Sequence, residues 1–459
     1  MGPRFGTDGI RGLANHELTP EVALALGRAA AETLDADAFV VGRDPRRSGP
    51  MLEAALVAGI CSAGVDVELL GTVPTPTVAW ASAHPEKVLG ANDRNAGRVA
   101  GAMISASHNP HPDNGIKLFA PGGLKLADGA EAAIEAVYQR YLANGSGDGP
   151  TGAGVGTVTT AEASSTTGWA DAIGASVATD ALDGLAIVLD CANGAAANVA
   201  GPIYENLGAR VRLIGNEPDG VNINDGYGST APQVLASAVT ETGADLGLAF
   251  DGDADRLIAV DETGSVIDGD RVLAILATDW ATTGRLNGNG VVVTVMSNLG
   301  FQLAMQDAGI DVVTTAVGDR YVLQALDERG LALGGEQSGH VICRDLATTG
   351  DGVLTGVQFA DAIARSGQPL SKLAGASMAS VPQVLRNVRL PARDDTLVSR
   401  LADEVASIEA AFGRDGRVLV RASGTEPLLR IMVEHIDPDV AERNCSRLVT
   451  AAEALVQQS

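Results

Sequence analysis

Residues 185–215 read LAIVLDCANGAAANVAGPIYENLGARVRLIG: a short apolar run, a turn, an Ala-rich stretch and a second apolar run. Apolar runs of this length bounded by turn residues predict strands, and the longer stretch between them predicts a helix. The same order recurs over residues 38–71, from AFVVGRD to AGVDVELLG, and over residues 290–318, from GVVVTVM to AGIDVVTTAVG. Strands that alternate with helices predict βαβ units and mostly parallel sheets.

The three copies are widely separated along the chain. Their matching glycines, Gly64, Gly208 and Gly309, lie much further apart than the roughly 20–50-residue period of solenoid repeats. We therefore expect three related α/β domains, and the Gly-rich stretch 144–156 is a plausible first linker. A further strand–helix alternation near the C-terminus predicts a smaller fourth domain. The expected domains are residues 1–150, 157–257, 258–370 and 376–459.

Charge and cysteine usage exclude several function classes. The chain has 459 residues and a net charge of −25, which is the opposite of the basic footprint of a nucleic-acid binder and disfavours anionic membrane surfaces. A phosphate-bearing substrate would therefore need a local basic pocket. The four cysteines are scattered without CxxC spacing, which suits a reducing compartment. No membrane-length apolar run or signal-peptide pattern is present, so we expect a cytoplasmic protein.

An acidic loop follows the apolar run LGLAF. The segment AFDGDADRLIAVDETG, residues 249–264, places Asp251, Asp253 and Asp255 at alternate positions. Three carboxylates so close together repel one another unless a cation lies among them, and hard oxygen ligands favour Mg²⁺. A solvated acidic turn is the alternative, although a buried strand leading into the loop disfavours it.

A second loop presents hydroxyl groups. In VAGAMISASHNPHPDNGIKLF, residues 99–119, a Ser- and Asn-rich loop that includes Ser105 and Ser107 joins two expected strands. The alternative is a turn without chemistry. Lys117, one of only four lysines in the chain, favours function, because a buried lysine can lose its proton near neutrality.

Three other segments are weaker candidates. In RVLVRASGTEPLLRIMVE, residues 417–434, Arg421 and Arg430 flank a turn that can present N–H groups and hydroxyls to a phosphate, although a simple hairpin has the same pattern. The run GGEQSGH, residues 334–340, suits reading of sugar hydroxyls, or is a solvated loop. RFGTDGIRG, residues 4–12, is an anion clamp or a plain turn.

Together these segments resemble the α-D-phosphohexomutase superfamily. RFGTDGIRG, ISASHNPHPDNGIK, DGDADR, GGEQSGH and RASGTEPLLR occur in that family's order, with one functional loop per domain, over nearly the whole chain. The resemblance implies an α/β fold of four domains around a central cleft, three related mixed-sheet α/β domains and a smaller C-terminal α+β domain.

The resemblance also implies roles for individual residues. Ser107 matches the phosphoserine, and its phosphate together with Asp251, Asp253 and Asp255 matches the ligand set of one Mg²⁺ per chain. Candidates for proton transfer or phosphate stabilisation are Arg11, His108, Lys117 and His340. The implied substrate-binding residues are Arg256, Gly318, Asp319, Arg320, Glu336, Ser338, His340, Arg421, Ser423, Gly424, Thr425 and Arg430.

The implied substrate is a small sugar phosphate. ISASHNP, NDGYGSTAP, TAVGDRYVL, GGEQSGH and TTGDG resemble the branch that interconverts glucosamine 6-phosphate and glucosamine 1-phosphate through a bisphosphate, which feeds UDP-N-acetylglucosamine and cell-wall synthesis. A mutase of mannose or glucose phosphates would share the main motifs, and an inert sugar-phosphate sensor is a third alternative. Two departures are Ala316, where a basic residue is expected, and Ala254, where glycine is common. Nothing in the sequence indicates an oligomeric state.

Overall fold

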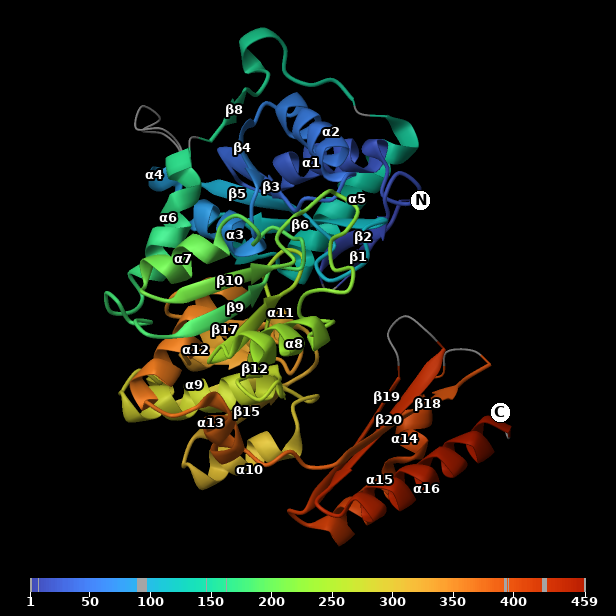
Figure 1. Cartoon of the computed structure of the whole chain (residues 1–459). Coiled ribbons are helices and arrows are strands. Elements are labelled where there is room, and N and C mark those ends of the chain that lie inside the picture. The colour runs from blue at the N-terminus through green and yellow to red at the C-terminus, as the bar shows by residue number, and fades with distance from the viewer. Residues whose placement is uncertain are drawn as a thin grey trace.

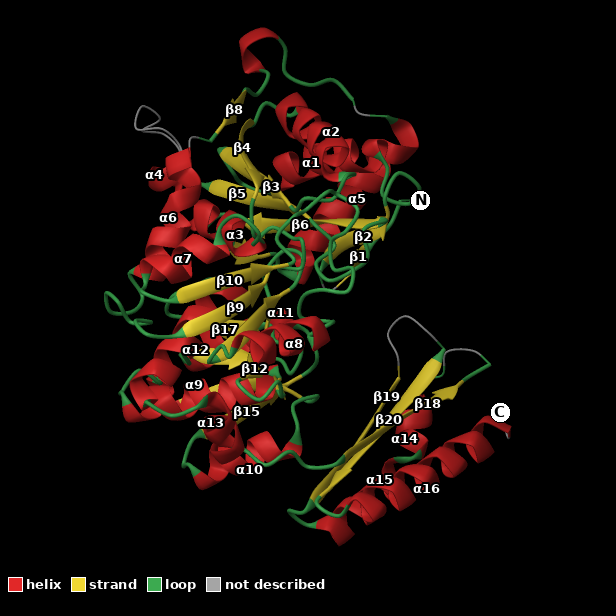
Figure 2. Cartoon of the chain, viewed as in Figure 1, coloured by secondary structure: helices red, strands yellow, loops and turns green. Residues whose placement is uncertain are grey.

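The fold was examined in a computed structural model that describes residues 2–6, 8–88, 97–145, 147–161, 163–391, 394, 396–422 and 427–457. Three α/β units follow one another along the chain, and a smaller C-terminal unit extends from the third (Figure 1). Figure 2 shows strands grouped into separate sheets, with helices packed against them. The predicted class, three mixed-sheet α/β domains with a smaller α+β domain, is confirmed.

The first sheet is built around strands buried on both faces. Its central strand, AFVVGR, is almost wholly buried, as expected for a parallel strand covered by helices. The strand order is β1-β2-β6-β5-β3-β4-β8, with β7 beside β6. The strands are β1 Phe5–Gly6, β2 Gly9–Leu13, β3 Ala38–Arg43, β4 Asp66–Thr72, β5 Val99–Ile104, β6 Asp113–Ala120, β7 Leu124–Lys125 and β8 Val158–Thr160. The helices are α1 Pro20–Thr33, α2 Gly49–Ser62, α3 Thr75–Ala83, α4 Pro85–Val88 and α5 Asp128–Asn144.

The second sheet has the order β10-β9-β11-β12-β13. Its strands are β9 Ala186–Asp190, β10 Arg210–Ile214, β11 Leu246–Phe250, β12 Leu257–Asp261 and β13 Val266–Ile267, and its helices are α6 Ala163–Gly174, α7 Ala200–Asn206 and α8 Gln233–Thr242. β12 begins at residue 257, the expected end of the second domain, and β13 lies beyond it, although both belong to the second sheet. β8 lies after the expected start of the second domain but pairs with β4 of the first sheet.

The third sheet has the order β15-β14-β16-β17. Its strands are β14 Gly290–Thr294, β15 Asp311–Thr315, β16 Leu333–Gly335 and β17 Val341–Cys343. Its helices are α9 Gly269–Thr282, α10 Leu299–Asp307, α11 Asp319–Arg329, α12 Gly352–Ser366 and α13 Leu370–Ser377. Helix α12 is buried along most of its length, and a single apolar cluster runs through the second and third units.

One four-strand pattern recurs in all three α/β sheets. Three parallel strands are followed by a fourth, antiparallel strand, in the orders β4-β3-β5-β6, β10-β9-β11-β12 and β15-β14-β16-β17. The connection from the third to the fourth strand is the serine loop in the first unit, the acidic loop in the second and the GGEQSGH loop in the third. Three motifs that are far apart in sequence therefore occupy the same topological position.

The C-terminal unit has an antiparallel sheet of order β18-β20-β19, with β18 Gln383–Arg389, β19 Gly416–Ala422 and β20 Leu428–His435. Its helices are α14 Thr396–Arg400, α15 Ala402–Phe412 and α16 Pro438–Gln457, and the unit has its own apolar core. Asn298, just before α10, joins it to the third unit by donating to Oε1 of the buried Glu434 at 3.0 Å. Arg417 also donates to the Ser297 carbonyl.

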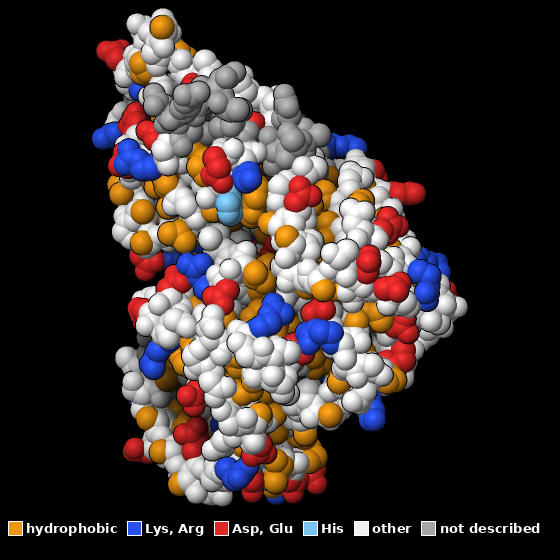
Figure 3. Space-filling model, turned by 90° about the vertical axis from the view of Figure 1, so that its left-hand side faces the viewer, with side chains coloured by type: hydrophobic (Ala, Val, Ile, Leu, Met, Phe, Trp, Pro, Cys, Tyr) orange, Lys and Arg blue, Asp and Glu red, His pale blue; other side chains and the backbone are white. Residues whose placement is uncertain are grey.

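Acidic and basic side chains are interspersed over the face shown in Figure 3, and that face has no continuous basic area. No helix in the part of the chain that the structure describes is long and apolar enough to cross a membrane.

Candidate active site

Ser107 lies in the loop between β5 and β6 and is only 1% exposed. Its φ of 53° is in the left-handed region, which is unfavourable for serine. Its hydroxyl donates to Oδ2 of Asp251 in the second unit at 2.5 Å, and Nδ1 of His108 lies 3.3 Å from the same hydroxyl. The two loops named by the sequence therefore meet across a domain boundary.

The acidic loop between β11 and β12 gathers its three aspartates into one cluster. Asp251, Asp253 and Asp255 are buried, and one carboxylate oxygen from each lies within 4.8 Å of the others. Asp253 Oδ1 and Asp255 Oδ1 are buried and accept no hydrogen bond from any described residue. Buried polar atoms without partners are rare, so a ligand for these oxygens is indicated. The cluster could bind a metal ion.

Gly252 explains how closely the two loops approach. A Cβ at this position would lie 2.7 Å from the Ser107 carbonyl oxygen and 2.7 Å from Cδ1 of Ile223. A side chain would therefore separate the acidic loop from the serine loop.

Lys117, on β6, reaches the same carboxylates. Its Nζ lies 2.9 Å from Oδ2 of both Asp253 and Asp255, and 3.3 Å from Asp8 Oδ2. Burial lowers the pKa of Lys117, but the three carboxylates outweigh burial and hold this pKa well above its ordinary value. Lys117 is thus positively charged in this arrangement rather than poised to lose its proton. Thr75 donates to Asp253 Oδ2 at 2.6 Å.

The pKa values of two carboxylates in the cluster are shifted in opposite directions. Burial, Asp255 and Asp253 together raise the pKa of Asp251 well above its usual value. For Asp255, burial acts in the same direction but is outweighed by Lys117 and His340, which hold its pKa well below the usual value. This difference follows from which carboxylate has cationic neighbours.

His340, from the loop between β16 and β17, completes the cluster from the third unit. Its Nδ1 lies 3.7 Å from Asp255 Oδ1, and its Nε2 lies 3.3 Å from Asp319 Oδ2. Burial lowers the pKa of His340, but the two carboxylates outweigh this and raise it. Lys125 in turn pairs with Asp319.

Arg256 contacts the aspartate cluster directly, and Arg11 contacts Asp8, the carboxylate that also lies beside Lys117. Arg11 pairs with Asp8 and donates to Asn109 Oδ1 at 3.5 Å. The backbone N–H of Arg256 donates to Asp251 Oδ1 at 3.2 Å, and its Nε lies 3.8 Å from Asp255 Oδ1.

His108 stands out because its pKa is lowered to about 4, first by burial and then by the positive charges of Arg256 and Arg11. In this arrangement its imidazole is neutral at pH 7, and Nδ1 lies 3.3 Å from the Ser107 hydroxyl, whose hydrogen is donated to Asp251.

The proposed sugar-reading loop forms a small network of its own. Glu336 Oε1 accepts a hydrogen bond from the Gly318 N–H at 3.1 Å, and Ser338 donates to Glu336 Oε2 at 3.3 Å. Ser338 is exposed and Glu336 is half-buried, so both can be reached by a ligand. This brings two of the predicted substrate-binding segments, GGEQSGH and TAVGDRYVL, together.

Arg320 points elsewhere. Its guanidinium donates to both carboxylate oxygens of Glu131 in α5, at 2.9 and 3.0 Å, and pairs with Asp128. In this structure Arg320 joins the third unit to the first and has no contact with the aspartate cluster among its described hydrogen bonds and ion pairs.

Arg421 on β19 and Arg430 on β20 occupy directly opposite positions of the two antiparallel strands. Burial and then the charge of Arg430 lower the pKa of Arg421, and Nε of Arg430 is buried with no hydrogen-bond partner among the described residues. Two neighbouring like charges, one of them with an unsatisfied donor, indicate an anion site. The predicted residues Ser423, Gly424 and Thr425 lie outside the described residues.

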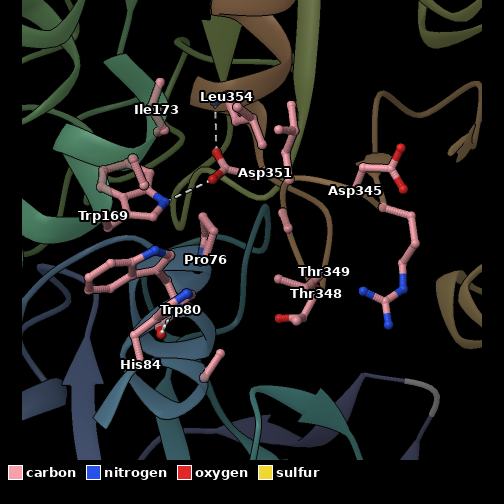
Figure 4. A pocket seen from close by; sticks show the side chains of 15 residues that line it. Pro76, Trp80, His84, Trp169, Ile173, Asp345, Thr348, Thr349, Asp351 and Leu354 are labelled. Atoms are coloured by element: carbon pink, nitrogen blue, oxygen red, sulfur yellow. Dashed lines mark hydrogen bonds between the residues drawn. The ribbon is translucent and has the colours of Figure 1, made fainter. Parts of the chain in front are cut away.

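A separate cavity of about 250 Å³ lies where α3, α6 and the TTGDG segment meet (Figure 4). The Trp169 indole N–H donates to Asp351 Oδ2 at 2.9 Å, and Asp351 Oδ1 accepts from the Leu354 N–H at the start of α12. The branch-like TTGDG segment therefore joins the third unit to the second.

Several residues of the site were missed by sequence reasoning. Asp8 and Thr75 contact Lys117 and Asp253, while Asp44 and Arg46 support the serine loop from within the first unit. Asp8 lies within the RFGTDGIRG motif, of which only Arg11 was predicted to take part in the reaction. The segment GRDPRRSG was the available signal for Asp44 and Arg46, since it places opposite charges directly after a buried strand.

Comparison with protein families gives matches along most of the chain. The models described as phosphoglucomutase/phosphomannomutase alpha/beta/alpha domains I, II and III match residues 2–144, 167–264 and 268–381, and the C-terminal domain model matches residues 385–451. The chain belongs to this family, the phosphohexomutases.

Its full-length relatives place it within one branch. The phosphoglucosamine mutase of Streptomyces avermitilis is 52% identical over 99% of both chains, and that of Rhodococcus jostii is 50% identical over 98% of both chains. Among solved structures, a phosphoglucomutase/phosphomannomutase family protein from Burkholderia thailandensis matches 99% of this chain and 98% of its own, with a TM-score of 0.82 and 25% identity. The phosphoglucosamine mutase branch expected from the sequence is thus confirmed.

Proposed function

We propose that this chain interconverts glucosamine 6-phosphate and glucosamine 1-phosphate, with Ser107 carrying the transferred phosphate. One observation carries the assignment of the carrier. The Ser107 hydroxyl is the only one among the described residues that donates to the aspartate cluster from the serine loop, and it reaches Asp251 at 2.5 Å. A serine so close to three buried carboxylates needs compensating positive charge before it can carry a phosphate dianion.

A metal ion would supply the first part of that compensation. Asp251, Asp253 and Asp255, together with the phosphate on Ser107, would hold one Mg²⁺, and the two unpartnered carboxylate oxygens suit a hard cation. When bound, the ion offsets charge on the phosphoryl group in transit.

The cationic side chains would do the rest. Lys117 is held in its charged form and Arg11 lies nearby, so both can stabilise the transferring phosphoryl group. Arg256 contributes charge from the acidic loop. Of the four predicted candidates, proton transfer to and from the sugar hydroxyl then falls to His108 or His340, because Lys117 is held in its charged form. Nδ1 of His108 lies 3.3 Å from the Ser107 hydroxyl, and Nδ1 of His340 lies 3.7 Å from Asp255 Oδ1.

Two transfers complete the reaction. The Ser107 Oγ–P bond breaks as a bond forms from phosphorus to O1 of glucosamine 6-phosphate, which gives the 1,6-bisphosphate. The bisphosphate reverses its orientation, and the phosphate on O6 moves to Ser107 Oγ to release glucosamine 1-phosphate. In both orientations Arg421 and Arg430 would bind the phosphate that does not react, helped by Ser423, Gly424 and Thr425.

The sugar ring would be read by the third unit. Glu336, Ser338 and His340 are placed to accept or donate hydrogen bonds to ring hydroxyls, with Gly318 and Asp319 supporting them. Arg320 would join this set only after leaving Glu131. The choice of glucosamine over glucose or mannose rests on the relatives, which are phosphoglucosamine mutases.

The setting we propose is the cytoplasm. The four cysteines are all buried and free, which suits a reducing compartment.

The decisive experiment compares kcat/KM for glucosamine, glucose and mannose 6-phosphates on one preparation, with the matching 1,6-bisphosphate as activator. We expect glucosamine 6-phosphate to be preferred by roughly ten- to a hundred-fold, the range that one unpaired polar contact at C2 provides. A preference for a neutral sugar would contradict the substrate, and phosphate found by peptide mass spectrometry at a serine other than Ser107 would contradict the carrier.

A further inference from the structure

One buried arginine is surrounded by the carbonyl groups of the serine loop. Arg46 is fully buried, and its guanidinium donates to the carbonyl oxygens of Ser107 at 3.0 Å, Asn109 at 2.7 Å, Pro110 at 2.6 Å and Asp113 at 3.1 Å. One side chain thus fixes four peptide groups of the loop that carries Ser107.

Arg46 also reaches the other side of Ser107 through a chain of hydrogen bonds. Its Nε donates to Asp44 Oδ2 at 2.9 Å, and the Ser105 hydroxyl donates to the same oxygen at 2.7 Å. The Ser107 N–H donates to Ser105 Oγ at 2.9 Å. Both the N–H and the carbonyl of Ser107 are therefore held by the buried Asp44–Arg46 pair.

The second unit holds the same loop from outside. Asn224 belongs to the NDGYGSTAP segment, and its Nδ2 donates to the carbonyls of Ser107 at 2.9 Å and Asn109 at 3.1 Å. Each of these two carbonyls accepts one hydrogen bond from Arg46 and one from Asn224. The φ of Asn224 is 60°, a conformation that asparagine tolerates better than most residues.

We infer that Arg46 and Asn224 are positioning residues for phosphoryl transfer, a conclusion that rests on the proposed role of Ser107. They act through the Ser107 backbone, which they hold in an unfavourable left-handed conformation that aims the hydroxyl at the aspartate cluster. Because one of the two belongs to each unit, alignment of Ser107 depends on how the first and second units meet.

The first test replaces each donor while keeping local geometry. Asn224→Gly removes the amide and keeps the positive φ, and we expect kcat to fall roughly tenfold with KM changed less than about twofold. Arg46→Lys keeps the charge beside Asp44 but loses the planar fork, and we expect kcat to fall roughly a hundred-fold. A fall in kcat with little change in KM separates poor alignment of Ser107 from lost substrate binding.

Matched controls exist in the same chain. Asn289 has a φ of 47° and donates from Nδ2 to the Gly309 carbonyl, so Asn289→Gly makes the same change in the third unit. Arg43, paired with Glu53, provides Arg43→Lys in the first unit. Both controls should keep kcat within about twofold of the wild-type value.

A second readout needs no substrate. Amide hydrogen exchange of a peptide spanning residues 105–116 should be faster in Asn224→Gly and Arg46→Lys than in the wild type. In a third variant, Arg46→Ala, added guanidinium ion should restore part of the lost kcat. Wild-type exchange, or wild-type kcat in both variants, would overturn the inference, as would loss of activity that only follows loss of folded protein by circular dichroism. If the wild-type protein has no mutase activity, the proposed function fails, while the exchange measurement still tests whether Arg46 and Asn224 hold the serine loop.

Discussion

The aspartate cluster and the C-terminal arginine pair are built in opposite ways. Around Ser107 and Asp251, buried groups from three units hold one another through hydrogen bonds and ion pairs, although Asp253 Oδ1 and Asp255 Oδ1 accept no hydrogen bond from a described residue. Arg421 and Arg430 lie half-buried on a hairpin in the last unit, next to each other and with an unsatisfied donor. The comparison indicates that the groups that transfer phosphate are preorganised, whereas the groups that bind the passive phosphate are completed by the ligand itself.

The largest expected effect on activity comes from removing the phosphate carrier, Ser107, from the preorganised cluster. Ser107→Ala should lower kcat by about 10⁴-fold or more, because no other hydroxyl takes its place beside Asp251. Steady-state assays with added bisphosphate measure the loss. Ser62→Ala in α2, where the hydroxyl bonds only the Gly59 carbonyl in the same helix, is the control and should retain activity.

The next largest effect concerns the metal ligands. Asp253→Asn should lower kcat by roughly 10²–10³-fold while the chain stays folded, because one ligand and one partner of Lys117 are lost. Excess chelator should abolish activity, and Mg²⁺ should restore it. Full activity in chelator would contradict the metal site. The matched control is Asp245→Asn, because this carboxylate lies outside the cluster and accepts a hydrogen bond from the Ala186 N–H.

A smaller effect is expected at the arginine pair. Arg421→Ala should raise KM about ten- to a hundred-fold or release bisphosphate during turnover, through loss of charge-assisted hydrogen bonds worth about 1.5–3 kcal/mol. Thermal stability should not fall, because the change relieves repulsion from Arg430. Arg386→Ala removes an exposed arginine from the same sheet and should leave KM unchanged.

The smallest effect tests the junction that carries the arginine pair. Burial raises the pKa of Asp270 to about 7, and Asp270 Oδ2 accepts from the N–H of Asn298, which in turn bonds Glu434 of β20. The unfolded chain loses this proton near pH 4 and the folded chain near pH 7, so the free energy of unfolding should fall as pH rises between these values. Asp270→Asn should flatten that dependence by about 1 kcal/mol or more. Denaturant melts at pH 5 and pH 8 measure the free energy of unfolding. If it changes by the same amount between the two pH values in wild type and variant, the assignment is contradicted.

Much of the fold was predictable because its signals are local. The apolar strands AFVVGR, LGLAF and GVVVT are continuous runs buried by helices on both sides, so each α/β unit could be identified from its own sequence. The placement of β8 beside β4 was not predictable, since a three-residue exposed strand carries no pattern of its own. The shared core of the second and third units likewise depends on α12, which fills the space between two sheets.

Local motifs were enough to identify the chemically competent residues: the Ser107 loop, the aspartates of DGDADR and the arginines that flank the last hairpin turn. Only the tertiary structure, however, brings these residues together into one site. Ser107 meets Asp251, Lys117 meets Asp253 and His340 faces Asp255 only because three sheets present the same interstrand connection toward a common point. The contacts of Arg46, Asn224 and Arg320 were invisible in the sequence for the same reason. Each joins residues more than sixty positions apart, and such pairings have no local period or spacing to reveal them.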